Sequence, residues 1–97
     1  MSVLAWTLDP DGRRVELTAE RWAHILEETD GHPELAGLVD DVMRAVAAPE
    51  RRRAGRAPNE EWLYVSGAGP SRWLKVVVLY AEGRGFVVTA HPRRGFP

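Results

Sequence analysis

The polar residues best suited to acid–base chemistry lie in the last third of the chain, inside segments that are otherwise apolar. Lys75 interrupts the apolar run 73–80, and Thr89 and His91 alternate with apolar residues in 86–91. Successive side chains of a β-strand point to opposite faces. The alternation therefore predicts Lys75, Thr89 and His91 on one face, away from the core. An ammonium, a hydroxyl and an imidazole there could move protons and stabilise negative charge.

Two aromatic residues are predicted on the same face. In segment 61–66, Leu63 and Val65 fit an inward row, which turns Trp62 and Tyr64 outward with Ser66. Aromatic rings stack on unpaired bases, and cations hold phosphates. The mixture suits RNA. The alternative is that the exposed rings cover a dimer or partner surface.

Cleavage of RNA by its own 2′-hydroxyl is a chemistry that these residue types can support. It needs a base near the 2′ oxygen, an acid near the leaving 5′ oxygen and positive charge near the phosphorus. Neither a metal nor a cofactor is required, and none is predicted. The chain has no cysteine, which excludes a thiolate metal site, and its three histidines lack the spacing of a zinc motif.

Basic residues cluster beside these segments. Residues 1–48 carry four arginines against ten acidic residues, a balance of −6, whereas residues 49–97 have a balance of +5. A polyanion would therefore bind the second half, unless charges of both signs merely keep the surface solvated. The predicted contacts to RNA in this half are Trp62 and Tyr64, a mobile basic loop with Arg51, Arg52, Arg53 and Arg56, and Arg93 and Arg94 after His91.

The elements that must position these residues follow from turn and helix signals. Residues 1–17 are predicted to form a hairpin around the turn Asp9–Gly12. Residues 18–48 are predicted to form two helices, the first capped by Thr18 and the second opening at His32–Pro33 and stopping at Pro49. Residues 49–60 are a polar, basic linker. Residues 61–92 are predicted to form three antiparallel strands.

The element order ββααβββ predicts one α+β domain over residues 1–97, with two helices on one face of a twisted antiparallel sheet. The inward rows are predicted to be Leu74, Val76, Val78 and Tyr80 in one strand, and Phe86, Val88 and Ala90 in the next. No apolar run reaches the roughly 18–20 residues of a membrane span, and the first residues lack the basic start of a signal peptide. A cytoplasmic protein without a membrane partner is expected.

The chain contains five short motifs in a fixed order: Arg21–Leu26, His32–Leu35, the helix end between Val42 and Pro49, Leu74–Val78 and Val87–Pro92. Together they resemble the barnase/EndoU/colicin/RelE-like nuclease superfamily of small phage and bacterial proteins. The resemblance covers roughly residues 15–97 and implies two helices followed by an antiparallel sheet. It also implies a metal-independent ribonuclease, often a toxin restrained by an antitoxin protein.

The resemblance also implies site residues. The helix histidine of the family falls on His24, the basic residue after the helix-ending proline falls among Arg51, Arg52 and Arg53, and the polar position of the last strand falls on Thr89, with His91 beside it. On a helical wheel His24 lies about 200° from Trp22. If Trp22 faces the sheet, His24 points away from it.

The function predicted from the sequence is that of a metal-independent endoribonuclease with His24, Lys75, Thr89 and His91 as catalytic residues. Its substrate would be RNA, either free or on the ribosome, and an antitoxin would be its protein partner. Two alternatives remain open. One is a non-catalytic module of the same fold that binds RNA or protein. The other is a small structural protein of a phage or mobile element.

Overall fold

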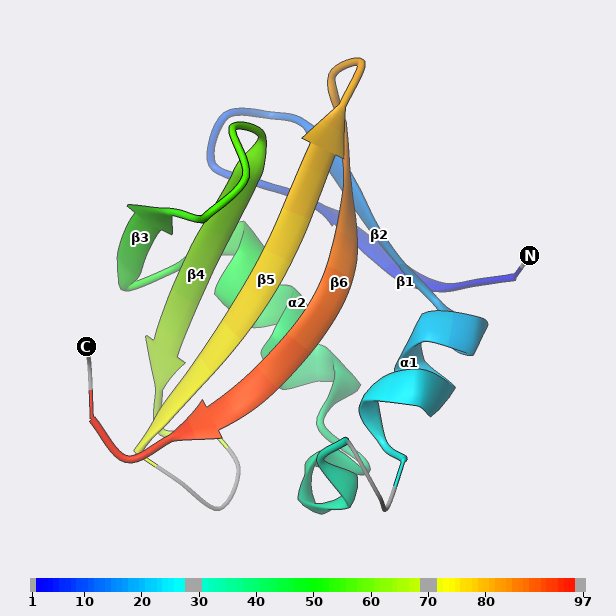
Figure 1. Ribbon diagram of the computed structural model, residues 1–97, viewed down its shortest axis with the longest axis vertical. Coiled ribbons are helices and arrows are strands. Elements are labelled where there is room, and N and C mark those ends of the chain that lie inside the picture. Colours follow the sequence, from blue (N-terminus) through cyan, green and yellow to red (C-terminus); the bar gives the residue numbers. More distant parts are fainter. Residues whose placement is uncertain (1, 28–30, 69–71, 96–97) are drawn as a thin grey trace.

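The computed structural model describes residues 2–27, 31–68 and 72–95 of the chain as an α+β fold. Two α-helices and a short 3-10 helix lie against a six-stranded sheet (Figure 1). The strands are β1 (Val3–Leu8), β2 (Arg14–Thr18), β3 (Arg51–Ala54), β4 (Glu60–Ser66), β5 (Trp73–Ala81) and β6 (Arg84–Arg93). The helices are α1 (Ala19–Ile25), the 3-10 helix η1 (Pro33–Leu35) and α2 (Val39–Ala47).

The sheet is mixed, not antiparallel as the sequence analysis predicts. Its strand order is β1-β2-β6-β5-β4-β3, and β2 pairs with β6 in parallel. The other neighbouring strands are antiparallel. The parallel contact is short, running from Arg14 opposite Arg84 to Glu16 opposite Phe86. In Figure 1, α2 crosses one face of the sheet, and α1 lies beside β6, past the end of this contact.

Strand β3 lies within the predicted linker, so the order ββααβββ is incomplete. Residues Arg51–Ala54 pair with Glu61–Tyr64 of β4. All four residues of β3 are exposed, and an edge strand of this kind needs no apolar alternation, because backbone hydrogen bonds hold it and charges guard its free side. The sequence analysis therefore missed this strand, because residues 51–54 show no apolar alternation.

The two helices are shorter than predicted. Thr18 caps α1 as expected, because its hydroxyl accepts a hydrogen bond of 3.1 Å from the backbone N–H of Arg21. The second predicted helix is interrupted after its first turn. Gly37 has a φ of +84°, a conformation that a helix cannot continue through. Residues Pro33–Leu35 therefore form only η1, and α2 begins at Val39.

The core lies between α2 and the sheet, and it contains the predicted row of β5. Leu74, Val76, Val78 and Tyr80 are all buried, as are Leu63 and Val65 of β4. The apolar side of α2 packs on this row through Val42, Ala45 and Val46. We call the opposite surface of β3, β4, β5 and β6 the open face. Lys75 and Val77 alternate with the core row and point toward this face, where both are largely buried.

A β-bulge at Val88 divides strand β6. Thr89 lies opposite Val77, but the next residue of β5, Val78, lies opposite Val87, so Val88 is an extra residue. The prediction for this strand is therefore correct only beyond the bulge, where Ala90 is buried. Before it, Val87 enters the core at 3% exposure and Phe86 is 38% exposed, the reverse of the prediction.

Gly85 lies where β6 passes closest to its neighbours. A Cβ atom built on it would be 2.8 Å from the Tyr80 ring and 2.9 Å from a methyl group of Val15. Both neighbours are buried, so neither can move away without repacking the core.

We expect Gly85→Ala to reduce the free energy of unfolding by about 1–3 kcal/mol, because it overpacks the contact between β2, β5 and β6. Chemical denaturation followed by tryptophan fluorescence would measure the change. Gly95→Ala is the matched control, since a Cβ atom there meets nothing within 4 Å. Equal stability of the two variants would contradict the expectation.

Candidate functional site

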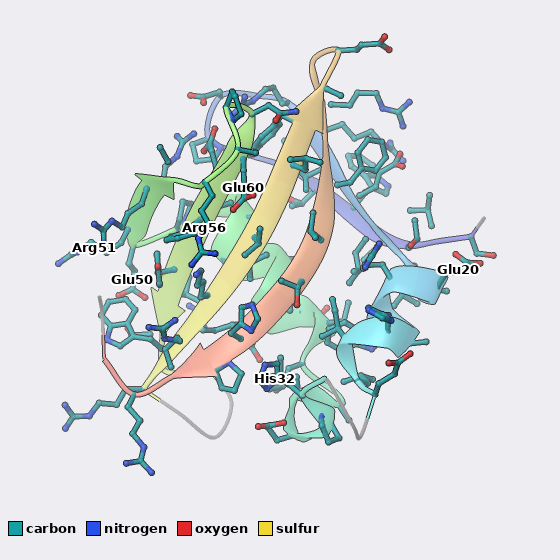
Figure 2. The ribbon with its side chains drawn as sticks, in the orientation of Figure 1. Glu20, His32, Glu50, Arg51, Arg56 and Glu60 are labelled. Carbon is teal, nitrogen blue, oxygen red and sulfur yellow. The ribbon has the colours of Figure 1, made fainter. Side chains whose placement is uncertain are left out.

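The register of β4, β5 and β6 places the predicted polar residues side by side on the open face. Lys75 lies opposite Tyr64 on one side and opposite His91 on the other. The row above consists of Trp62, Val77 and Thr89, and the row below of Ser66, Trp73 and Arg93. Figure 2 shows Arg56 and Glu60 on the same face, over β4 and β5.

Lys75 is held against an indole ring. Its ammonium nitrogen lies 3.5 Å from the centroid of the Trp62 ring, a cation–π contact. The Trp62 indole N–H donates a hydrogen bond of 2.6 Å to Glu60, which fixes the ring. Lys75 is only 9% exposed. Burial lowers its pKa, and the nearby Arg93 and Arg56 lower it further.

His91 is half-buried and is bonded to a second histidine. Nδ1 of His91 lies 3.1 Å from Nε2 of His32, and the two rings meet edge to face. Burial lowers the pKa of His91, and its neighbours His32, Lys75 and Arg93 lower it further. Because an ordinary histidine titrates near pH 6.5, His91 is neutral at pH 7 and can accept a proton.

Tyr64 differs from the prediction. It belongs to the row of Lys75, but it is completely buried instead of exposed. At the centre of the open face, the side chains of Tyr64 and Lys75 are therefore buried instead of exposed to solvent. Its accessible polar groups lie toward β6, where Thr89, His91 and Arg93 are half-exposed.

The basic segment 51–56 is not the predicted mobile loop. Arg51 and Arg53 lie opposite Tyr64 and Trp62, on the open face, whereas Arg52 alternates to the other side. Arg56 follows β3 and is exposed, as is Arg94 after β6. The sheet thus separates the arginines that the sequence places together.

His24, the residue implied by the family resemblance, lies apart from the open-face rows. Its side chain is 61% exposed on α1, and Nδ1 lies 3.1 Å from a carboxylate oxygen of Glu27. Helix α1 packs beside β2 and β6, and His24 lines a surface cavity with Thr18, Glu20 and Arg21. The structure brings Lys75, Thr89 and His91 onto one face and leaves His24 outside it.

His32 is the residue that sequence reasoning missed. Its place before Pro33 suggests an N-cap, yet its side chain makes no capping hydrogen bond and contacts His91, 59 positions away in the chain. No local signal could have revealed this contact, because it depends on where the end of β6 meets the segment before η1.

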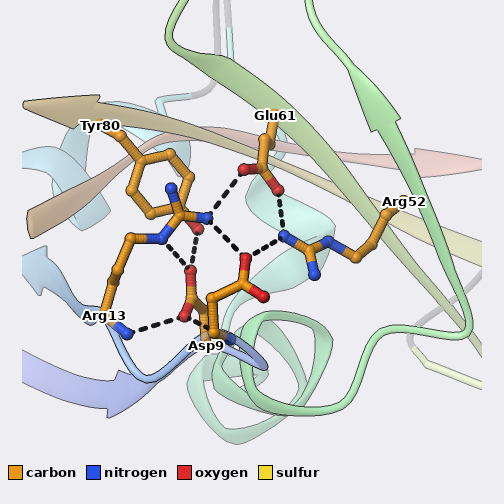
Figure 3. A network of polar contacts seen from close by, with 6 residues as sticks. Asp9, Arg13, Arg52, Glu61 and Tyr80 are labelled. Atoms are coloured by element: carbon orange, nitrogen blue, oxygen red, sulfur yellow. Dashed lines mark hydrogen bonds and ion pairs between the residues drawn. The ribbon is translucent and has the colours of Figure 1, made fainter. Parts of the chain in front are cut away.

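A second polar cluster lies on the opposite side of the sheet, between the β1–β2 turn and β3 (Figure 3). Asp9 is 5% exposed and accepts hydrogen bonds of 2.8 Å from the Tyr80 hydroxyl and from Nε of Arg13. Glu61 lies between Arg13 and Arg52, 2.8 Å from each. The cluster ties the two ends of the sheet together and borders a cavity of about 430 Å³.

The charges of this cluster are paired. Burial by itself raises the pKa of Asp9, but hydrogen bonds from Arg13 and Tyr80 outweigh it and lower the pKa overall. Glu61 follows the same pattern, with Arg13 and Arg52 as its partners. Burial and the bond to Asp9 raise the pKa of Tyr80. Groups that hold each other so firmly serve structure better than proton transfer.

No family model matches the chain, and the searches of curated proteins and of solved structures find no significant match either. Within residues 2–27, 31–68 and 72–95, no helix is long and apolar enough to cross a membrane. The same residues contain no group of three or more histidine or acidic side chains that could hold a metal ion.

We expect stability to fall as the solution is acidified, with Asp9 as a main cause. The pKa values of Asp9 and Glu61 are lowered by folding. Their contribution is therefore present above the unfolded values of about 4 and is lost as the pH falls through the folded values. Asp9→Asn should reduce the free energy of unfolding by about 1–3 kcal/mol at pH 7. Below pH 5 the variant should lose less further stability than the parent chain does.

Denaturation midpoints between pH 7 and pH 2 would test this expectation. Asp40→Asn is the control, because Asp40 is exposed at the start of α2. An Asp9→Asn variant with the same acid profile as the parent chain would show that the cluster does not carry the pH dependence.

Proposed function

We propose that the protein is a metal-independent ribonuclease that cleaves single-stranded RNA on the open face. The observation that carries the proposal is the pairing of His91 with Lys75 on adjacent strands. Desolvation and neighbouring cations keep the imidazole neutral at pH 7, and the same cations supply the positive charge that a cleaved phosphate needs.

The roles follow from the chemistry of each group and from its place in the register of β5 and β6. His91 is the half-exposed base that takes the proton of the 2′-hydroxyl, and the 2′ oxygen then attacks the phosphorus. The 5′ oxygen leaves and receives that proton through water, so the products are a 2′,3′-cyclic phosphate and a 5′-hydroxyl. Lys75, with Arg93 beside it, stabilises the charge on the phosphorus-bound oxygens, and Thr89 can hold one of them.

RNA is the substrate class that fits the surroundings of this pair. Trp62 and Trp73 are half-exposed on the two sides of Lys75, in position to stack on bases. Arginines surround them on the same face, where they can hold successive phosphates. They are Arg51 and Arg53 of β3, Arg56 after it and Arg93 at the end of β6.

A second candidate is a module of the same fold that binds RNA without cleaving it. The burial of Lys75 under Trp62 favours it, because the ammonium group already has a partner and the indole ring must move before a phosphate can touch it. A protein partner that restrains the ribonuclease, as an antitoxin does, would be expected to present acidic residues to this arginine-rich face.

We expect the purified protein to cleave a labelled single-stranded RNA in excess EDTA and to leave 2′,3′-cyclic phosphate ends. His91→Ala should lower the rate by about 10²–10⁴-fold, the usual contribution of a general base. Lys75→Met keeps the length and packing of the side chain and removes only the charge, so its activity should also fall. Melting temperatures would confirm that each variant is folded.

The activity of a His24→Ala variant tests whether the site includes α1. If it retains full activity, the site lies on the open face and not on α1, where the family resemblance places one residue. RNA that is bound but stays intact, both free and on ribosomes, would overturn the enzyme and leave the binding module.

A further inference from the structure

We infer that His32 is a positioning residue that holds His91 in the tautomer with a free Nε2. The inference rests on the proposed function only for its catalytic consequence. The hydrogen bond between the two imidazoles, and the proton arrangement that it selects, are properties of the folded chain alone.

The 3.1 Å contact between His91 Nδ1 and His32 Nε2 requires one nitrogen to donate and the other to accept. If His91 donates, its Nε2 keeps a lone pair and can act as a base. If a neutral His32 donates, Nε2 of His91 carries the proton instead, and the base is lost. The direction of this single hydrogen bond therefore decides what His91 can do.

Glu34 favours the first arrangement. A carboxylate oxygen of Glu34 lies 3.7 Å from Nδ1 of His32. This negative charge favours a proton on Nδ1, and a neutral imidazole protonated at Nδ1 has only Nε2 left, as an acceptor. Glu34, His32 and His91 thus form a chain in which each group orients the next, as the carboxylate and histidine of a catalytic triad do.

The backbone holds His32 in reach of His91. The N–H of His32 donates a 2.6 Å hydrogen bond to the carbonyl of Ile25, and the N–H of Gly31 bonds to the carbonyl of Glu27 at 2.8 Å. A Cβ atom on Gly31 would be 2.4 Å from the Ile25 carbonyl oxygen. Only glycine fits there, and its contact with the end of α1 aims the following residue at β6.

The charged groups around the pair act in one direction. His32 faces Glu34, whereas His91 faces Lys75 of β5 and Arg93 of its own strand. The negative charge therefore lies on the His32 side, and the positive charges lie on the side where a phosphate would bind. Desolvation adds to this asymmetry by keeping His91 uncharged at pH 7.

The tautomers can be read directly from the full chain by long-range ¹H–¹⁵N NMR of the imidazole rings at pH 8, with no RNA present. We expect His91 to be protonated at Nδ1 and bare at Nε2. His32→Phe removes the acceptor and should release this preference. His32→Gln keeps an acceptor oxygen and should largely restore it. His24, which bonds to Glu27, is an internal control whose signals should not change.

The catalytic consequence is tested with the same two variants. His32→Phe should lower kcat by about tenfold or more with little change in KM, and it should shift the pH–rate profile, whereas His32→Gln should recover most of the rate. A His91 ring protonated at Nε2 in the parent chain would overturn the inference, whether or not RNA is cut. The expected tautomer in a protein that leaves RNA intact would overturn only the proposed function.

Discussion

The bulge at Val88 is the constraint on which the arrangement of the sheet depends. At Gly85, strand β6 passes within contact distance of Val15 and Tyr80. Further along, β6 pairs with β5 so that Thr89 and His91 point to the open face. A regular strand of period two cannot satisfy both halves with this sequence. One extra residue resolves the conflict, because it reverses the faces of everything before it. The bulge thus allows Val87 to enter the core while His91 stays beside Lys75.

Sequence patterns predicted the parts of the fold that depend on local chemistry. The Thr18 cap and the buried row of β5 were correct, because each follows from spacing within one segment. The prediction was wrong where a residue's environment depends on residues far away in the sequence. The bulge in β6 and the pairing of β3 have no local signature, and the burial of Tyr64 depends on what covers the face from outside its strand. Of the site, the row through Lys75 and His91 was predictable, but the contact of His32 was not.

The two polar clusters of the sheet differ in how their charges are paired. In the cluster of Asp9 and Glu61, arginines meet carboxylates at hydrogen-bonding distance, and their charges are spent on holding the β1–β2 turn to β3. On the open face, the polar groups meet aromatic rings and each other, and cations outnumber acids. A chain with a net charge of −1 can therefore present a basic surface, because Asp9, Asp11 and Glu61 are engaged in the other cluster.

The place of β6 in the sheet also bears on how the chain folds. β6 is the last strand in the sequence, yet it lies between β2 and β5 near the middle of the sheet. The β1–β2 hairpin therefore has no inner neighbour until residues 84–86 are available. During synthesis, this hairpin cannot pair with β6 before residues 84–86 have emerged. The pairing of β2 with β6 closes a long loop, and contacts between such distant segments form slowly. We therefore expect completion of the sheet to be a late step in folding.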